Sequence, residues 1–457
     1  MRKLLFDQVS AEADFNQITG TFNKAQHSTN SAPNLSNRGI SDFTENFKSM
    51  NFEYSRTHDW PLWNAGQRVI DTHFVFPLMH LDPADPKNYY FAPSDEMIRK
   101  TQEAGCKVFY RLGTSIEHSG LRPDQKHFNS MPPEDYEKYA EVLAGIIRHY
   151  TKGWANGFHY DMQYWEIWNE AENDPTCWKG SYEEFIKFFV IVLKRLKAEY
   201  PELKIGGPAA TCSVREDLFI PLLKACKDAG IAPDFFSWHS YECDPNSLIG
   251  QPARMKEFLK EHGFPNCELA VTEWHYLVSW DGVQRNMSEE NRRLALESQG
   301  GLCGIDSAVY NLSVLCGWQD TCLDMGFYYG ANPVGDWGYM NIFGGYNKNF
   351  FSMRMFGTLL GSFEKKIKSR SLDGAVYLQG GVSDDGKTGM LLVTDYRSNA
   401  TFRQVKVDGM DGASVSAILL DHTHNMTMLD VTFENGVLTL PKTAIGSAAY
   451  LVKFDKR

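Results

Sequence analysis

The sequence contains no hydrophobic run long enough for a membrane helix, which needs about 20 apolar residues. Its first seven residues hold two basic side chains but an apolar run of only three residues, far too short for the core of a signal peptide. Runs of lysine and arginine are also missing, and the net charge is -11. These absences exclude a membrane-spanning protein and argue strongly against nucleic-acid binding.

Paired cysteine motifs are absent as well. The nine cysteines are an odd number and include no C-x-x-C pair, and Cys106, Cys212 and Cys316 lie in apolar runs. Buried, reduced thiols are typical of a cytoplasmic protein. We therefore expect a cytoplasmic location, and a secreted or periplasmic protein without its signal segment is the alternative.

The periodicity of the chain predicts an α/β fold. Between residues 40 and 362, amphipathic helices alternate with short apolar strands at 52–58, 106–112, 163–168, 204–208, 235–240, 268–272 and 325–329. An early strand near residues 17–22 completes eight strand–helix steps. Eight such steps predict a (β/α)8 barrel, which we place at residues 10–365.

The pattern changes after residue 368, where six or seven short strands are separated by turn sequences such as Asp384-Asp385-Gly386-Lys387. Short alternating strands in series favour a β-sandwich. We assign residues 366–457 to this second domain, and residues 1–9 could add a strand to it.

Two glutamates close apolar strands. Glu170 ends the run from Trp165, and Glu273 ends the run from Leu269. In a parallel barrel the carboxyl ends of the strands form the face that carries the active site. Two carboxyls facing each other there can act as acid and nucleophile across a glycosidic bond, with about 5–5.5 Å between them in a retaining enzyme.

Polar and aromatic residues at other strand ends are candidates for the same site. His239 and Tyr241 end the sixth strand, and Tyr241 could hydrogen-bond Glu273 and keep it ionised. Arg56, in an apolar context, needs a carboxylate partner, which Glu273 or Glu166 could supply.

Three further side chains are predicted to contact the sugar. His58 and Asp59 follow the second strand and are placed to bind sugar hydroxyls. Trp337 follows the eighth strand in a glycine-rich loop, where it could stack on a sugar ring or simply pack. Arg111 could support the site or form a structural ion pair.

These motifs together resemble family 39 of the glycoside hydrolases, within the clan of retaining (β/α)8 enzymes. The resemblance is carried by Arg56-x-His58, Trp168-Asn169-Glu170, His239-x-Tyr241 and Thr272-Glu273-Trp274. It implies a barrel with a β-sandwich and activities such as β-xylosidase or α-L-iduronidase. It also implies that Glu170 is the acid/base, that Glu273 is the nucleophile, and that Asn169 binds the substrate 2-hydroxyl.

Two departures from the family pattern leave the sugar open. Ala171 stands where a proline commonly follows the acid/base, and residues 328–332 lack the acidic segment associated with the xylosidases. We expect a retaining, exo-acting hydrolase of short oligosaccharides, of the β-D-xyloside or α-L-arabinofuranoside type. No cofactor or metal is expected, and a homo-oligomer is possible.

Two alternatives belong to other classes. A metal-dependent barrel hydrolase could use His58, Asp59, His239 and Glu273 as ligands, but it leaves Asn169 and Glu170 unexplained. A catalytically silent sugar-binding protein is the other alternative, which the presence of both glutamates disfavours.

Overall fold

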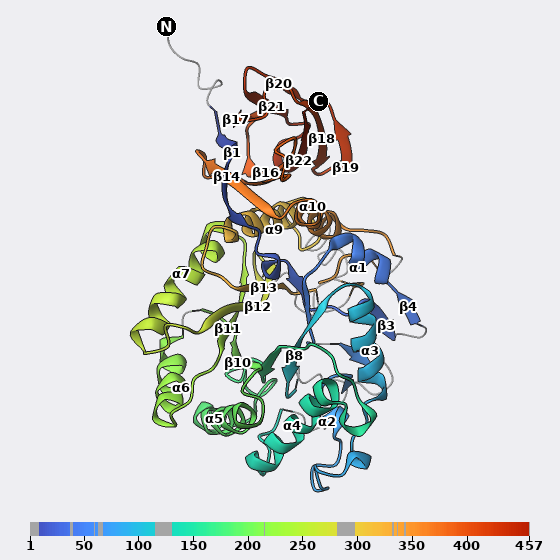
Figure 1. The fold of residues 1–457 in the computed structure, drawn as a ribbon, viewed down its shortest axis with the longest axis vertical. Coiled ribbons are helices and arrows are strands. Elements are labelled where there is room, and N and C mark those ends of the chain that lie inside the picture. The colour runs from blue at the N-terminus through green and yellow to red at the C-terminus, as the bar shows by residue number, and fades with distance from the viewer. Residues whose placement is uncertain are drawn as a thin grey trace.

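Eight parallel strands close into a barrel in the computed structural model of the chain (Figure 1). The structure describes residues 9–36, 40–58, 60–62, 67–114, 130–213, 215–280, 298–330, 333–335, 337–341 and 344–456. In chain order the barrel strands are β2 (Ser28–Thr29), β5 (Tyr54–Arg56), β8 (Lys107–Leu112), β9 (Tyr164–Ile167), β10 (Lys204–Ala210), β11 (Phe235–Glu242), β12 (Glu268–Tyr276) and β13 (Met325–Tyr328). The predicted (β/α)8 barrel is confirmed.

Helices lie around this barrel (Figure 1). They are α1 (Thr44–Met50), α2 (Thr72–Val75), α3 (Ala92–Glu103), α4 (Tyr136–Lys152), α5 (Tyr182–Glu199), α6 (Glu216–Asp228), α7 (Pro245–Glu261), α9 (Ile305–Trp318) and α10 (Lys348–Ser362). Short 3-10 helices span Lys24–Gln26, Pro86–Asn88 and Trp154–Asn156. Two small hairpins pair β3 (Asn34–Ser36) with β4 (Ile40–Asp42) and β6 (Pro61–Leu62) with β7 (Gln67–Arg68).

The interior of the barrel is layered because side chains two residues apart on a strand point to the same side. Its lower layer is aromatic, with Phe109 4.7 Å from Phe327 and 5.3 Å from Phe235 between ring centroids. Two residues nearer the carboxyl ends, the buried side chains become charged, at Arg56, Arg111 and Glu166. The charged layer at the carboxyl ends of the strands therefore packs on an apolar layer inside the barrel.

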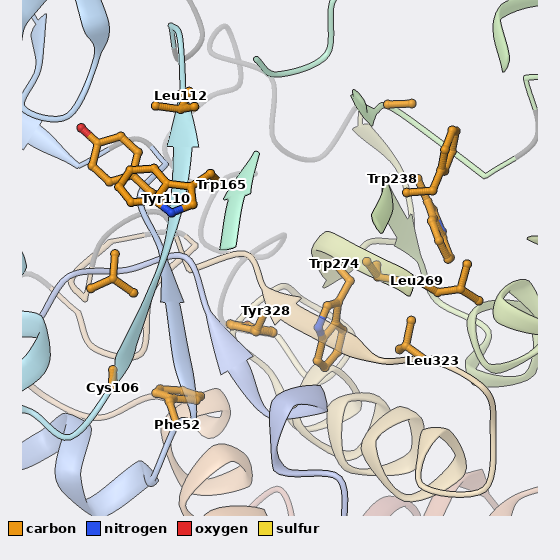
Figure 2. Close-up of a cluster of buried hydrophobic side chains, with 14 of the residues drawn as sticks. Phe52, Cys106, Tyr110, Leu112, Trp165, Trp238, Leu269, Trp274, Leu323 and Tyr328 are labelled. Atoms are coloured by element: carbon orange, nitrogen blue, oxygen red, sulfur yellow. The ribbon is translucent and has the colours of Figure 1, made fainter. Parts of the chain in front are cut away.

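The outer side of the barrel packs against the helices through large apolar side chains (Figure 2). Tyr110 and Trp165, from neighbouring strands, stack with ring centroids 4.9 Å apart. Trp238 is fully buried, and its indole nitrogen donates to Gln251 Oε1 of α7 at 2.8 Å. Burying each such side chain contributes about 1.5–3 kcal/mol, so this shell holds the strand ends in place.

The C-terminal region forms one ten-stranded sheet that curls around its own apolar core. Its strands run in the order β19-β18-β22-β16-β15-β14-β1-β17-β21-β20. They are β14 (Lys365–Ser371), β15 (Val376–Val382), β16 (Thr388–Ser398), β17 (Phe402–Asp408), β18 (Ser414–Leu420), β19 (Asn425–Leu429), β20 (Thr432–Glu434), β21 (Val437–Pro441), β22 (Gly446–Asp455) and β1 (Ala11–Thr21). The sheet lies against α9 and α10 at one edge of the barrel (Figure 1).

One strand assignment from the sequence is wrong. The strand predicted near residues 17–22 was counted as the first barrel strand, but β1 pairs with β14 and β17 in the C-terminal sheet. The first barrel strand is instead β2, which is only two residues long and polar. The strand β1, at residues 11–21, belongs to the C-terminal sheet. The strand expected at residues 1–9 stays a prediction, because residues 1–8 lie outside the described part of the chain.

The helix α3 begins at Ala92, and in its first turn the Ser94 hydroxyl donates to the carbonyl of Val69 at 2.5 Å. None of the helices described here has the length and apolar character needed to cross a membrane.

Candidate active site

Glu170 and Glu273 reach the same face of the barrel, but the conformation of the backbone differs at the two positions. Glu273 lies within β12, whereas Glu170 follows β9 in a tight turn. Trp168 and Glu170 adopt left-handed backbone angles, with φ of 68° and 43°. The N–H of Trp168 donates to Leu112 O at 2.8 Å, and that of Glu170 to Ala209 O at 2.9 Å. Unfavourable φ values of this kind persist where the surroundings impose them, which is common at functional sites.

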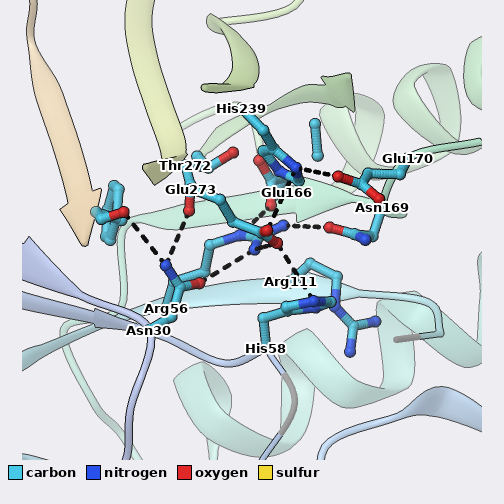
Figure 3. A network of polar contacts seen from close by, with 12 residues as sticks. Asn30, Arg56, His58, Arg111, Glu166, Asn169, Glu170, His239, Thr272 and Glu273 are labelled. Atoms are coloured by element: carbon cyan, nitrogen blue, oxygen red, sulfur yellow. Dashed lines mark hydrogen bonds and ion pairs between the residues drawn. The ribbon is translucent and has the colours of Figure 1, made fainter. Parts of the chain in front are cut away.

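The carboxyl groups of Glu170 and Glu273 face each other in one cavity of about 900 Å³. An oxygen of each carboxyl and a ring nitrogen of His239 all lie within 4.8 Å of one another (Figure 3). An oxygen-to-oxygen approach this short favours the spacing of about 5–5.5 Å between carboxyls in retaining glycosidases over the roughly 6.5–9.5 Å of inverting ones.

Glu273 is buried and held by three neighbours. Arg56 donates to Oε1 at 2.9 Å, Tyr241 donates to Oε2 at 2.6 Å, and His58 Nε2 lies 3.3 Å from Oε1. Burial raises the pKa of Glu273, and the neighbouring Glu170 carboxyl adds to this, while His239, Arg56 and Tyr241 oppose the rise. The donors therefore stabilise the ionised form that burial alone would disfavour.

Arg56 lies at the centre of the polar network (Figure 3). Its guanidinium donates to Glu166 at 2.6 Å and to Asn169 Oδ1 at 2.8 Å, in addition to its contact with Glu273. Arg56 is fully buried and does not line the cavity, and its guanidinium is bound to Glu166, Asn169 and Glu273, so it positions these groups. Both partners foreseen for it, Glu166 and Glu273, are present.

His239 stands between the two acids. Its Nδ1 lies 2.6 Å from Glu170 Oε1 and 3.4 Å from Glu273 Oε2. Burial lowers the pKa of His239, which favours the neutral imidazole. Glu170 also receives a hydrogen bond from Asn173 at 3.3 Å, so each oxygen of its carboxyl has a neighbour.

Aromatic rings form one wall of the cavity. Tyr241 contacts Trp280, Tyr329 and Trp337, with ring centroids 5.2, 5.9 and 5.8 Å apart. Trp280 is 54% exposed, so one of its faces is open to a ligand. Burial raises the pKa of Tyr241 well above its ordinary value, and the phenol remains a donor to Glu273.

The remaining predicted site residues differ in their surroundings. Asn169 is buried, and its Nδ2 has no hydrogen-bond partner among the described residues. His58 is also buried and contacts Glu273, while Asp59 lies outside the described residues. Arg111 forms a buried ion pair with Asp71, which makes it structural.

Sequence reasoning missed several residues that line the cavity. Trp280 and Tyr329 follow strands and are aromatic, a signal that could have found them. Glu172 and Arg215 also line the cavity, but nothing in their sequence context separates them from ordinary exposed charges.

A metal centre is the alternative use of this cluster, because Glu170, His239 and Glu273 are close enough to share an ion. Ligand atoms about 2.0–2.1 Å from one tetrahedral zinc ion would lie roughly 3.3 Å apart. The distance of 2.6 Å between His239 Nδ1 and Glu170 Oε1 is that of a hydrogen bond. The arrangement therefore fits a hydrogen bond between His239 and Glu170 better than a preformed metal site.

The closed barrel of eight parallel strands defines a class of fold whose members carry their active sites at the carboxyl ends of the strands. The model of "Glycosyl hydrolases family 39" matches residues 9–258, more than half of the 457 residues. The chain belongs to this family.

Individual relatives agree with the family assignment. A β-xylosidase of Caldicellulosiruptor saccharolyticus is 30% identical over 203 residues, which are 43% of this chain and 38% of that protein. The crystal structure of a glucosidase from Croceicoccus marinus has a TM-score of 0.79 at 18% identity, covering 99% of both chains. A monomeric β-xylosidase from Caulobacter crescentus CB15 has a TM-score of 0.70 at 15% identity, covering 98% of this chain and 99% of that one. At these low identities, the two structures support the fold alone.

Proposed function

We propose that the protein is a retaining, exo-acting glycoside hydrolase that cleaves short oligosaccharides or glycan side chains by double displacement. The observation that carries the proposal is the pair of carboxyls, Glu170 and Glu273, with oxygens within 4.8 Å in one cavity at the carboxyl ends of the strands. Family membership supports the same chemistry.

In the first step, a carboxylate oxygen of Glu273 attacks the anomeric carbon and the glycosidic bond breaks. Glu170 gives its proton to the departing oxygen, so that a neutral alcohol leaves. Arg56 and Tyr241 hold Glu273 ionised and aimed at the sugar. Asn169 precedes Glu170, and its buried Nδ2 has no hydrogen-bond partner among the described residues, which supports a role as donor to a hydroxyl of the sugar ring. Such a contact strengthens as positive charge develops on the ring.

In the second step, water attacks the anomeric carbon and Glu170 accepts its proton. The bond from the sugar to Glu273 breaks and restores the carboxylate. Two inversions give net retention. His239 hydrogen-bonds Glu170, and burial lowers its pKa and favours the neutral imidazole. A neutral imidazole puts no permanent positive charge beside Glu170, which must both donate and accept a proton.

β-D-Xylosides and α-L-arabinofuranosides share the anomeric geometry that this mechanism needs. The relative from Caldicellulosiruptor saccharolyticus is a β-xylosidase, which supports the first of these two classes. Trp337 and the exposed Trp280 are placed to stack on the sugar. A cavity of about 900 Å³ lies near the upper end of the roughly 300–1,000 Å³ of small-ligand sites, which suits a short saccharide.

A panel of 4-nitrophenyl glycosides tests the proposal. The purified protein should hydrolyse the β-D-xyloside or the α-L-arabinofuranoside, and proton NMR should show the product first in the anomeric form of the substrate. From a xylo- or arabino-oligosaccharide it should release single sugars. An inverted first product would contradict the double displacement, and no hydrolysis of either class would contradict the substrate assignment.

A further inference from the structure

The cavity has two unlike walls. The aromatic wall of Tyr241, Trp280, Tyr329 and Trp337 adjoins the nucleophile, because Tyr241 contacts Glu273 directly. A second group of lining residues lies near Glu170 and is polar; it consists of Glu172, Asn173, Thr211, Ser213 and Arg215, which we call the polar wall. A substrate that spans both catalytic glutamates would therefore meet different chemistry beside each of them.

Glu172 is the distinctive member of the polar wall. One of its oxygens, Oε1, accepts hydrogen bonds from the backbone N–H of Thr211 at 2.6 Å and from its hydroxyl at 3.0 Å. Among the described residues, no side chain donates a hydrogen bond to Oε2, and no Lys, Arg or His lies within ion-pair distance of the carboxyl. The side chain is thus held rigidly at one oxygen, and the other oxygen is available to a ligand.

The environment of Glu172 also suits a ligand with hydroxyl groups. Burial raises the pKa of its carboxyl, although the hydrogen bonds from Thr211 oppose the rise. A partly buried carboxylate that is in no direct ion pair is costly unless hydrogen-bond donors satisfy it. Sugar hydroxyls are such donors, and a carboxylate can accept two of them at once.

The chemistry of the two glutamates decides which end of the substrate meets this wall. The acid must face the oxygen of the leaving group, whereas the nucleophile bonds to the anomeric carbon of the sugar that stays. Residues beside Glu170 and away from Glu273 therefore face the leaving group. Glu172 follows Glu170 by two positions, and Asn173, the next residue of the polar wall, donates a hydrogen bond to Glu170.

We propose that the polar wall is a leaving-group subsite for a sugar, in which Glu172 accepts hydrogen bonds from hydroxyls of the departing saccharide. This inference rests on the proposed glycosidase function and deepens it. The substrates of the enzyme are then glycosides of another sugar, not of an apolar alcohol, and Glu172 determines this specificity.

The test compares two substrates that share the glycone accepted by the wild type. One is its 4-nitrophenyl or phenyl glycoside, and the other is the disaccharide with a sugar in the leaving position. Glu172→Gln keeps an oxygen for Thr211 but loses the charge, and Glu172→Ala removes the group. Glu216→Gln, an exposed position of α6 outside the cavity, is the matched control.

Both Glu172 variants should lose about 10- to 100-fold in kcat/KM for the disaccharide, the loss expected when hydrogen bonds to a charged group disappear. The loss should be larger for Glu172→Ala. Turnover of the aryl glycosides should change less than about threefold, and this result also shows that the variants are folded. Glu216→Gln should match the wild type on both substrates.

Equal losses on both substrates, or no loss on the disaccharide, would overturn the proposal. If Glu172 acts only through its charge on Glu170, its replacement will shift the pH profile of kcat/KM by the same amount for the phenyl glycoside and the disaccharide. That result would also overturn the proposal. A wild type that hydrolyses no aryl glycoside would instead refute the proposed function, so the two failures are distinguishable.

Discussion

Replacing Glu170 with alanine should separate substrates by the quality of their leaving groups. The wild-type carboxyl donates a proton to the departing oxygen, an effect that typically accelerates a reaction by about 10²- to 10⁴-fold. Phenyl glycosides and disaccharides need that proton and should lose rate by this factor. A dinitrophenyl glycoside leaves without protonation, so its first step should be nearly unchanged.

The structure indicates that this variant will remain folded. Glu170 contacts the side chains of His239, Asn173 and Cys177, and burial favours the neutral form of His239. Removal of the Glu170 side chain leaves none of these three partners with an uncompensated permanent charge, and it costs a few hydrogen bonds of about 0.5–1.5 kcal/mol each. It also opens space beside the anomeric carbon for a small anion.

Steady-state and pre-steady-state kinetics with aryl glycosides provide the assay. The dinitrophenyl substrate should show a rapid burst and then a slow second step, because no base activates water. Added azide needs no base, so it should restore turnover and yield a glycosyl azide of retained configuration. Equal rate losses for all leaving groups, or no effect of azide, would refute the role of Glu170.

Three further outcomes follow from the same contacts. Tyr241→Phe removes a hydrogen bond that lowers the pKa of Glu273, so the acid limb of the kcat/KM profile should move to higher pH; an unmoved limb would show that the contact does not tune the nucleophile. Arg56→Met leaves buried carboxylates uncompensated and should lower the free energy of unfolding by about 3–5 kcal/mol in denaturant titrations, whereas Arg99→Met on the surface of α3 should cost less than about 1 kcal/mol. Prolonged treatment with EDTA should leave activity unchanged, and a loss reversed by a divalent cation would favour the metal-dependent alternative.

The two catalytic glutamates could be predicted because the residues that identify them are their neighbours in the sequence. Glu170 and Glu273 each follow an apolar strand, and parallel strands bring their carboxyl ends to one face. The supporting contacts of Arg56 and Tyr241 followed from the same placement, since a buried cation and a phenol beside a carboxylate need partners.

Predictions from the sequence failed where a strand or side chain has its partner far away in the chain. The strand β1 was recognised, but its pairing with β14 joins residues some 350 positions apart, and local periodicity carries no information about such pairing. The true first barrel strand, Ser28–Thr29, is short and polar, so no hydrophobic pattern marks it. Likewise, only the folded chain shows that Asp71 forms an ion pair with Arg111 and that Glu172 lines the cavity.

The central claim is that Glu273 forms a covalent bond to the sugar. Incubation with the 2-deoxy-2-fluoro analogue of an accepted glycoside, followed by mass spectrometry of the digested protein, tests it directly. We predict one label per chain, on Glu273, and none on Glu273→Ala. A label on Glu170 would exchange the two roles, and an unlabelled protein inactivated by no competent analogue would contradict the covalent mechanism.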